Sequence, residues 1–183
     1  MHHTFTAEPG IELTTEIRLR AGLPEDAAAL AGVFVSAWRH SYPGVVPESS
    51  LQALDQDEIA ASLQAVLGSE GSTTVVAEAK THELFGFCRY GADPEEAGTG
   101  HVFSLYVSPL ASRRGLGARL LAHAVSDLEL RGLDRVTLWV FERNEPARRL
   151  YSSFGFFPDG GRVSESKYGA VEIRLRRVAK DAL

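Results

Sequence analysis

The chain has 183 residues, of which 44% are hydrophobic and 23% charged, and it carries a formal net charge of −5. This length suits one compact domain with a hydrophobic core. There is no run of about 18 apolar residues that could span a membrane, and the acidic balance argues against a general nucleic-acid binder, whose affinity depends on a basic surface. Cys88 is the single cysteine, which excludes an intramolecular disulfide.

The first residues differ in character from the rest of the chain. Segment 1–14 lacks the basic start and apolar middle of a signal peptide, so we expect a flexible leader followed by a single domain over 15–183. We therefore predict a cytoplasmic protein without membrane or nucleic-acid partners. The sequence leaves the oligomeric state open, with a homodimer as one candidate.

The first part of the domain is predicted to be a strand followed by helices. Alternating apolar and polar residues indicate a strand over 15–20. Pro24 then opens a helix whose apolar face runs to Trp38, before Pro43 and Gly44 interrupt the pattern. One or two shorter helices are expected over 49–67.

From Thr73 the pattern changes to a period of two. The runs 73–79 and 84–90 predict a hairpin, and 101–107 predicts a further strand. The remaining elements are a helix, a strand, a helix and two final strands, expected at 115–130, 135–141, 144–154, about 156–163 and 171–177. This order predicts a mixed α/β sheet with helices packed on its faces.

Two glycines one residue apart, Gly115 and Gly117, stand where a predicted strand leads into the long helix. Glycine lets an anion approach the backbone closely, and the free N–H groups of a first helical turn point at the anion with the positive end of the helix dipole behind them. Arg113 and Arg114 add positive charge nearby. The segment therefore predicts a phosphate site, although a turn that uses glycine only for steric reasons is the alternative.

Familiar motifs for this kind of site do not match. A P-loop needs Lys followed by Ser or Thr after its last glycine, and neither follows Gly117; the dinucleotide fingerprint needs a small residue where Leu120 stands. A Gly-x-Ser-x-Gly elbow is also absent, which removes the usual serine hydrolase interpretation. A different phosphate-bearing ligand is needed.

Residues 105–121 resemble the central strand, coenzyme loop and helix of the GNAT family of N-acetyltransferases. The family's loop reads Arg or Gln, two residues, Gly, one residue, then Gly or Ala; here Ser112 stands at the Arg or Gln position. A second block resembles the next part of the family, with a strand at 138–140 followed by Asn144, Ala147, Leu150, Tyr151, Gly155 and Phe156. The similarity extends more loosely over 17–177.

The resemblance implies an acyl-CoA N-acyltransferase fold, in which helices flank a central, twisted and mostly antiparallel sheet. It also implies transfer of acetyl from acetyl-CoA, as co-substrate, to a primary amine. The residues implied in coenzyme binding are Leu105, Tyr106, Val107, Arg113, Arg114, Gly115, Leu116, Gly117, Ala118 and Asn144. A module that binds acyl-CoA as a sensor or regulator without catalysis is the alternative.

Catalytic roles follow from the same resemblance. It places a general acid at Tyr151, which would protonate the departing sulfur, and a carbonyl-polarising N–H at Val107. By spacing alone, Tyr151 also fits a core aromatic, and Asn144 a helix N-cap. His101 is the candidate general base because an imidazole titrates near neutral pH, with Glu83 as a weaker candidate and a structural histidine as the alternative.

The acceptor is expected to be a small-molecule or peptide amine. Trp38 and Tyr42 stand at the end of the first long helix, where the family fold places one wall of the acceptor groove, and Tyr168 would form the facing wall. The alternative is that Trp38 belongs to the apolar face of the helix and Tyr42 caps it. The histidines show no metal-ligand spacing, so no metal site is predicted.

Overall fold

The computed structural model describes residues 16–164 and 168–179, so the predicted leader over 1–14 lies outside the described residues. The fold is built on a seven-stranded sheet in the order β1-β2-β3-β4-β5-β7-β6. The strands are β1 (Ile17–Ala21), β2 (Thr73–Ala79), β3 (Leu84–Ala92), β4 (Thr99–Val107), β5 (Arg135–Phe141), β6 (Phe157–Val163) and β7 (Glu172–Val178). The predicted mixed, mostly antiparallel sheet is confirmed.

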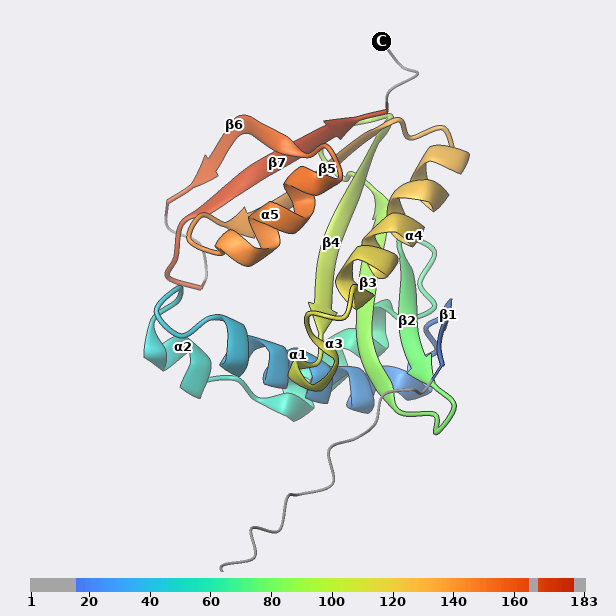
Figure 1. Cartoon of the computed structure of the whole chain (residues 1–183), viewed down its shortest axis with the longest axis vertical. Helices are drawn as coiled ribbons and strands as arrows, with labels where there is room; N and C mark the ends of the chain where they lie inside the picture. The colour runs from blue at the N-terminus through green and yellow to red at the C-terminus, as the bar shows by residue number, and fades with distance from the viewer. Residues whose placement is uncertain (1–15, 165–167, 180–183) are drawn as a thin grey trace, which may run out of the picture.

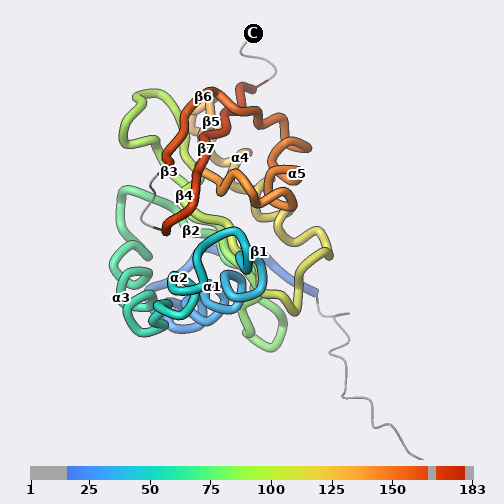
Figure 2. The backbone as a smooth tube through the Cα atoms, turned by 90° about the vertical axis from the view of Figure 1, so that its left-hand side faces the viewer, coloured from blue at the N-terminus to red at the C-terminus, as the bar shows by residue number. Residues whose placement is uncertain are grey.

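Helices cover both faces of the sheet (Figures 1 and 2). They are α1 (Ala27–Ser41), α2 (Glu48–Gln52), α3 (Gln56–Val66), α4 (Leu116–Leu130) and α5 (Glu145–Ser153), with single 3-10 turns at Pro24–Asp26 and Pro109–Ala111. The apolar sides of α4 and α5 share one core cluster with the sheet, and α1 and α3 contribute to a second cluster. Within the described ranges, no helix is long and apolar enough to cross a membrane.

The position of α4 follows from its sequence. Leu120, Leu121, Ala124 and Leu128 are fully buried along one side of the helix, and Gly132, at φ +77°, ends it in the left-handed conformation. Gly86 on β3 allows the close approach, because a Cβ there would lie 2.8 Å from the Tyr106 carbonyl oxygen and 3.1 Å from Leu120 Cδ1. The start of α4 is thereby held beside the end of β4.

The two central strands, β4 and β5, pair over only part of their length. They are the one parallel pair in the described sheet, and their register covers only Thr99–Val102 against Arg135–Leu138. Beyond Val102, β4 continues beside β3, whereas β5 continues beside β7, so the strands diverge (Figure 1). This parting leaves an opening in the middle of the sheet.

Candidate functional site

A pocket of about 710 Å³ lies where β4 and β5 part. It is lined by the end of α1, the last residues of β4, the loop into α4, and the first turns of α5. A smaller pocket of about 420 Å³ lies between α5 and β6 and contains none of the predicted site residues. The larger pocket is therefore the candidate site.

The exposed edge of β4 supplies backbone hydrogen-bonding groups to this pocket. Ser108 donates its N–H to the Phe85 carbonyl at 2.8 Å, so Ser108 faces β3. Because successive residues of an antiparallel strand direct their polar groups to opposite sides, Leu105 and Val107 direct theirs away from β3, toward the opening. Both residues line the pocket, and an extended ligand containing amides can pair with such an edge.

The loop before α4 forms a cradle of backbone N–H groups. Arg113 (φ +60°) and Gly115 (φ +77°) both adopt the left-handed conformation, and Gly115 caps α4 without a side-chain hydrogen bond. Among the described residues, none accepts a hydrogen bond from the N–H groups of 113–118. Since a non-glycine residue at positive φ is strained and such concave N–H arrays favour anions, the loop has the geometry of an anion site.

Side chains around the cradle only partly match the predictions. Arg113 lines the pocket, whereas Arg114 is exposed and does not. The Ser112 hydroxyl donates to the Pro109 carbonyl at 2.9 Å, which occupies it within the preceding turn. Arg149 of α5 lines the pocket from the opposite side. Arg149 is not among the coenzyme-binding residues predicted from sequence.

Tyr151 is held in the core by its ring and faces the pocket. The residue is 8% exposed, its ring packs edge-on against Phe156 at 6.0 Å, and it lines the pocket. Burial raises the pKa of Tyr151 well above its usual value, with smaller contributions from Cys88 and Tyr106. A phenol at its ordinary pKa is already protonated at neutral pH and burial preserves that state, so the packing role and the proposed acid role are compatible.

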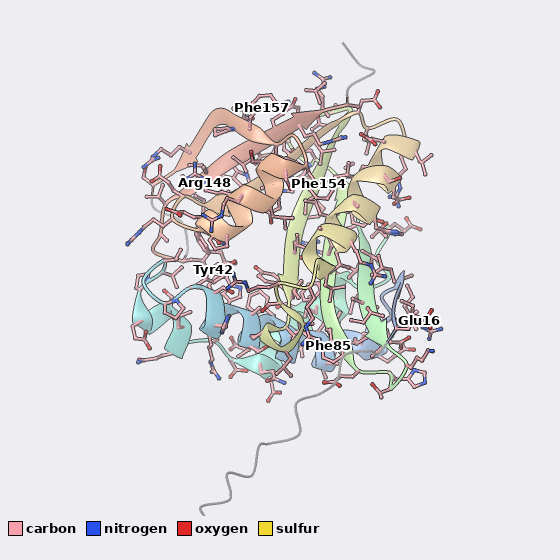
Figure 3. All side chains as sticks on the ribbon, viewed as in Figure 1. Glu16, Tyr42, Phe85, Arg148, Phe154 and Phe157 are labelled. Carbon is pink, nitrogen blue, oxygen red and sulfur yellow. The ribbon has the colours of Figure 1, made fainter. Side chains whose placement is uncertain are left out.

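Asn144 connects α5 to the end of α1. Its Oδ1 accepts a hydrogen bond from the Ala147 N–H at 3.3 Å, which confirms the predicted N-cap. Its side chain also interacts with the Tyr42 hydroxyl, partly opposing the rise in the Tyr42 pKa that burial causes. Tyr42 lies between α5 and the α1–α2 segment (Figure 3). Asn144 thus fixes the start of the helix that carries Tyr151.

Two of the three residues of the predicted acceptor wall do not line the pocket. Tyr42 lines the pocket as expected, but Trp38 is 1% exposed and does not, because the apolar face of α1 is covered here. The Trp38 ring packs 4.7 Å from Tyr42 and 4.8 Å from Tyr168, and Tyr168 lies 5.8 Å from Phe141. Trp38 therefore supports the wall from behind, and Tyr168 belongs to the same aromatic cluster without lining the pocket.

His101, the predicted general base, lies outside the candidate pocket. At about 3.3 Å per strand residue, His101 lies about 13 Å along β4 from Leu105, and it does not line the pocket. Its Nδ1 lies 2.8 Å from Thr137 Oγ1 and 3.4 Å from Asp93 Oδ2. Burial lowers its pKa, and Asp93 partly opposes the shift. These contacts fit a structural histidine, which was the alternative interpretation. The weaker candidate, Glu83, is exposed and also lies outside the pocket lining.

Glu172, the first residue of β7, is not among the residues predicted from sequence, and it does not line the pocket. Its strand partner is Phe141, and directly paired residues place their side chains on the same face of a sheet. Burial is the main cause of the raised pKa values of Tyr42 and Tyr106, two residues that line the pocket, and the charge of Glu172 makes a smaller contribution. No local pattern marks this residue, because its place depends on the β5–β7 register.

Cys88 is buried and does not line the pocket. Burial raises the pKa of the Cys88 thiol far above its usual range, which disfavours a nucleophilic thiolate. Over residues 16–164 and 168–179, there is no group of three or more His, Cys, Asp or Glu side chains that could hold a metal ion.

Comparison with known proteins gives consistent matches. The sequence model described as "Acetyltransferase (GNAT) family" matches residues 32–156. A probable N-acetyltransferase of Mycobacterium tuberculosis is 28% identical over 148 residues, which are 80% of this chain and 83% of that protein. A mycothiol acetyltransferase of Beutenbergia cavernae is 46% identical over 63 residues, which are 34% of this chain but 21% of that protein. The chain therefore spans about a fifth of this second relative.

A solved structure supports the fold. The PaiA N-acetyltransferase of Thermoplasma acidophilum, in complex with coenzyme A, superimposes with a TM-score of 0.73 at 18% identity. The match covers 89% of this chain and 99% of that chain.

Proposed function

Because the chain belongs to the GNAT family of acetyltransferases, we propose that it transfers acetyl from acetyl-CoA to a primary amine by direct attack. The observation that carries the proposal is the pocket between β4 and β5. It combines an anion cradle at the start of α4 with the protonated Tyr151 phenol at its inner wall. Neither feature alone supports the activity as strongly as their presence in one pocket.

The residues present fit coenzyme A. The N–H groups of 113–118 and the Arg113 and Arg149 side chains would hold its phosphates, and the β4 edge at Leu105 and Val107 would pair with the amides of its arm. Asn144 lies on the opposite wall. When bound, acetyl-CoA supplies a thioester carbonyl that an amine can attack.

Two groups of the chain would act on the reacting atoms. The Val107 N–H points toward the opening and would donate a hydrogen bond to the carbonyl oxygen as negative charge develops there. Tyr151 Oη would give its proton to the departing sulfur, and a positioned general acid contributes about 10²–10⁴-fold to rate. The burial that raises the pKa of Tyr151 also lowers the local polarity, which strengthens both hydrogen bonds.

The acceptor would enter from the α1 side, past Tyr42. A small-molecule or peptide amine is compatible with the pocket volume and with its aromatic wall. Cytoplasmic location and the absence of nucleic-acid and membrane partners stay predictions from composition.

Calorimetry with CoA, followed by thiol release from acetyl-CoA with a panel of primary amines, tests the proposal. We expect CoA binding and amine-dependent thiol release. Binding without release for any amine would favour the sensor alternative, and absence of binding at millimolar CoA would contradict the coenzyme site.

A further inference from the structure

The last turn of α1 presents one face to the larger pocket. Ala37, His40 and Ser41 all line it, and residues three and four positions apart lie on the same side of a helix. Trp38, one position along from Ala37, packs into the aromatic cluster with Tyr42 instead. His40 therefore stands on the pocket side of α1, at the end past which the acceptor would enter.

The His40 side chain is available to a ligand. It is exposed, and within residues 16–164 and 168–179 it makes no hydrogen bond, ion pair or ring contact. The Nδ1 atoms of His82 and His101, in contrast, each lie 3.4 Å from a carboxylate oxygen. The neighbouring charge on α1, Arg39, lines a separate hollow together with Glu48.

The proposed reaction needs a proton acceptor, because a primary amine at neutral pH is mostly in its ammonium form and cannot attack a carbonyl. The described lining of the pocket contains no Asp, Glu, Cys or Lys. Besides His40, its titratable side chains are Tyr42, Tyr106, Arg113, Arg149 and Tyr151. Arginines stay charged, and burial raises the pKa values of all three tyrosines, so none of these five takes up a proton near neutral pH.

We propose that His40 is the general base of the transfer, and that its imidazole takes a proton from the ammonium of the acceptor, directly or through one water. An imidazole changes charge near neutral pH, as this step requires. This inference rests on the proposed function and assigns the base that His101 does not supply.

The protons balance over the whole reaction. His40 takes one proton from the ammonium, and the neutral amine forms the C–N bond to the carbonyl carbon. The C–S bond breaks as Tyr151 gives its proton to the sulfur, and the second proton of the attacking nitrogen restores Tyr151. The exposed imidazole then releases its proton to solvent. The products are the amide, the free thiol of CoA and one proton.

His40→Gln keeps a side chain of similar size that cannot take up a proton, and it tests the proposal. Thiol release is measured in single turnovers of the full chain loaded with acetyl-CoA, from about pH 6 to about pH 10. The acceptors are saturating ethylamine, benzylamine and Nα-acetyl-lysinamide. At pH 7 the rate should fall by about 10²-fold or more, with CoA affinity retained in calorimetry. The deficit should shrink toward about pH 10, where more of the amine is already neutral.

His123→Gln is the matched control, because His123 is exposed on α4 and lies outside the pocket lining. It should keep the wild-type rates at every pH, and thermal unfolding checks that both variants fold. The wild-type profile is a second test that needs no variant. Its rate should level off above about pH 8, once the imidazole is neutral, whereas a reaction without a base keeps rising with the fraction of neutral amine.

An unchanged rate at pH 7 in folded His40→Gln would overturn the inference. A deficit that stays constant up to about pH 10, or a wild-type rate that rises throughout in proportion to neutral amine, would overturn it as well. If the wild type released no thiol with any of the three amines, the proposed function itself would be contradicted. Normal wild-type release together with unaffected His40→Gln would overturn only the role of His40.

Discussion

Gly117→Ala separates two explanations for the glycines at the start of α4. Gly117 does not adopt a positive φ, and a Cβ there would meet Leu150 Cδ2 at 3.5 Å and Val107 Cγ2 at 3.8 Å, both ordinary contacts. If the glycine served packing alone, alanine would be tolerated. Because alanine is the better helix former by up to about 1 kcal/mol, the melting temperature should stay constant or rise by up to about 4 °C.

The same methyl group would project between α5 and β4, into the space where an anion approaches the backbone. A hydrogen bond to a charged group is worth about 1.5–3 kcal/mol, so losing one at the pyrophosphate should weaken CoA binding by about tenfold or more. Calorimetry with CoA and thermal unfolding measure the two effects. Gly71→Ala is the control, because Gly71 has open space around its Cα and lies outside the pocket lining. An unchanged CoA affinity in folded Gly117→Ala would refute close approach at this position.

Three further predictions concern the frame of the site and its stability. Asn144→Ala removes the cap of α5 and should lower the free energy of unfolding by about 1 kcal/mol, which lowers the melting temperature by about 2–4 °C. Thiol release should fall as well. An unchanged melting temperature would contradict the role of Asn144 as a cap. Gly86→Ala should cost about 1–3 kcal/mol in denaturant unfolding because its Cβ would press on Tyr106 and Leu120, and a neutral result would contradict that contact. The Arg176 guanidinium lowers the pKa of Glu96 from 4.5 to about 2. The stabilisation that this ion pair gives the folded state is therefore present above pH 4.5 and is lost as the pH falls toward 2. Between pH 4.5 and 2, the melting temperature of Glu96→Gln should fall less steeply than that of the wild type. Identical pH profiles of the two proteins would contradict a stabilising role of the ion pair.

Local sequence patterns predicted much of the fold. The strand predicted over 135–141 coincides with β5, and the predicted start of the long helix at 115 lies one residue before Leu116. Both predictions depend on the period of the apolar residues and on flanking glycines, which are signals that extend over only a few residues. The cap at Asn144 follows from the same short range. Gly115, Gly117 and Tyr151 also share one pocket, as expected from the two motif blocks.

Residues whose roles depend on distant pairing were not predictable in this way. Glu172 comes beside Phe141 only because β7 pairs with β5, and His101 is kept from the pocket because β4 and β5 still pair at that level. The alternation of polar and apolar residues does not reveal where two parallel neighbours separate. Trp38 illustrates a different limit: helical periodicity placed it on the apolar face, but burial by Tyr42, Phe141 and Tyr168 depends on the closed tertiary fold.

We propose that this pocket catalyses acetyl transfer with Tyr151 as the acid. The most direct test of this proposal is the single-turnover rate of thiol release when the protein loaded with acetyl-CoA meets a primary amine, in the wild type and in Tyr151→Phe. Tyr90→Phe, which removes a buried tyrosine hydroxyl on β3 outside the pocket lining, serves as control. The account predicts a fall of about 10²–10⁴-fold in Tyr151→Phe with CoA affinity retained. Equal rates in the wild type and Tyr151→Phe would contradict it.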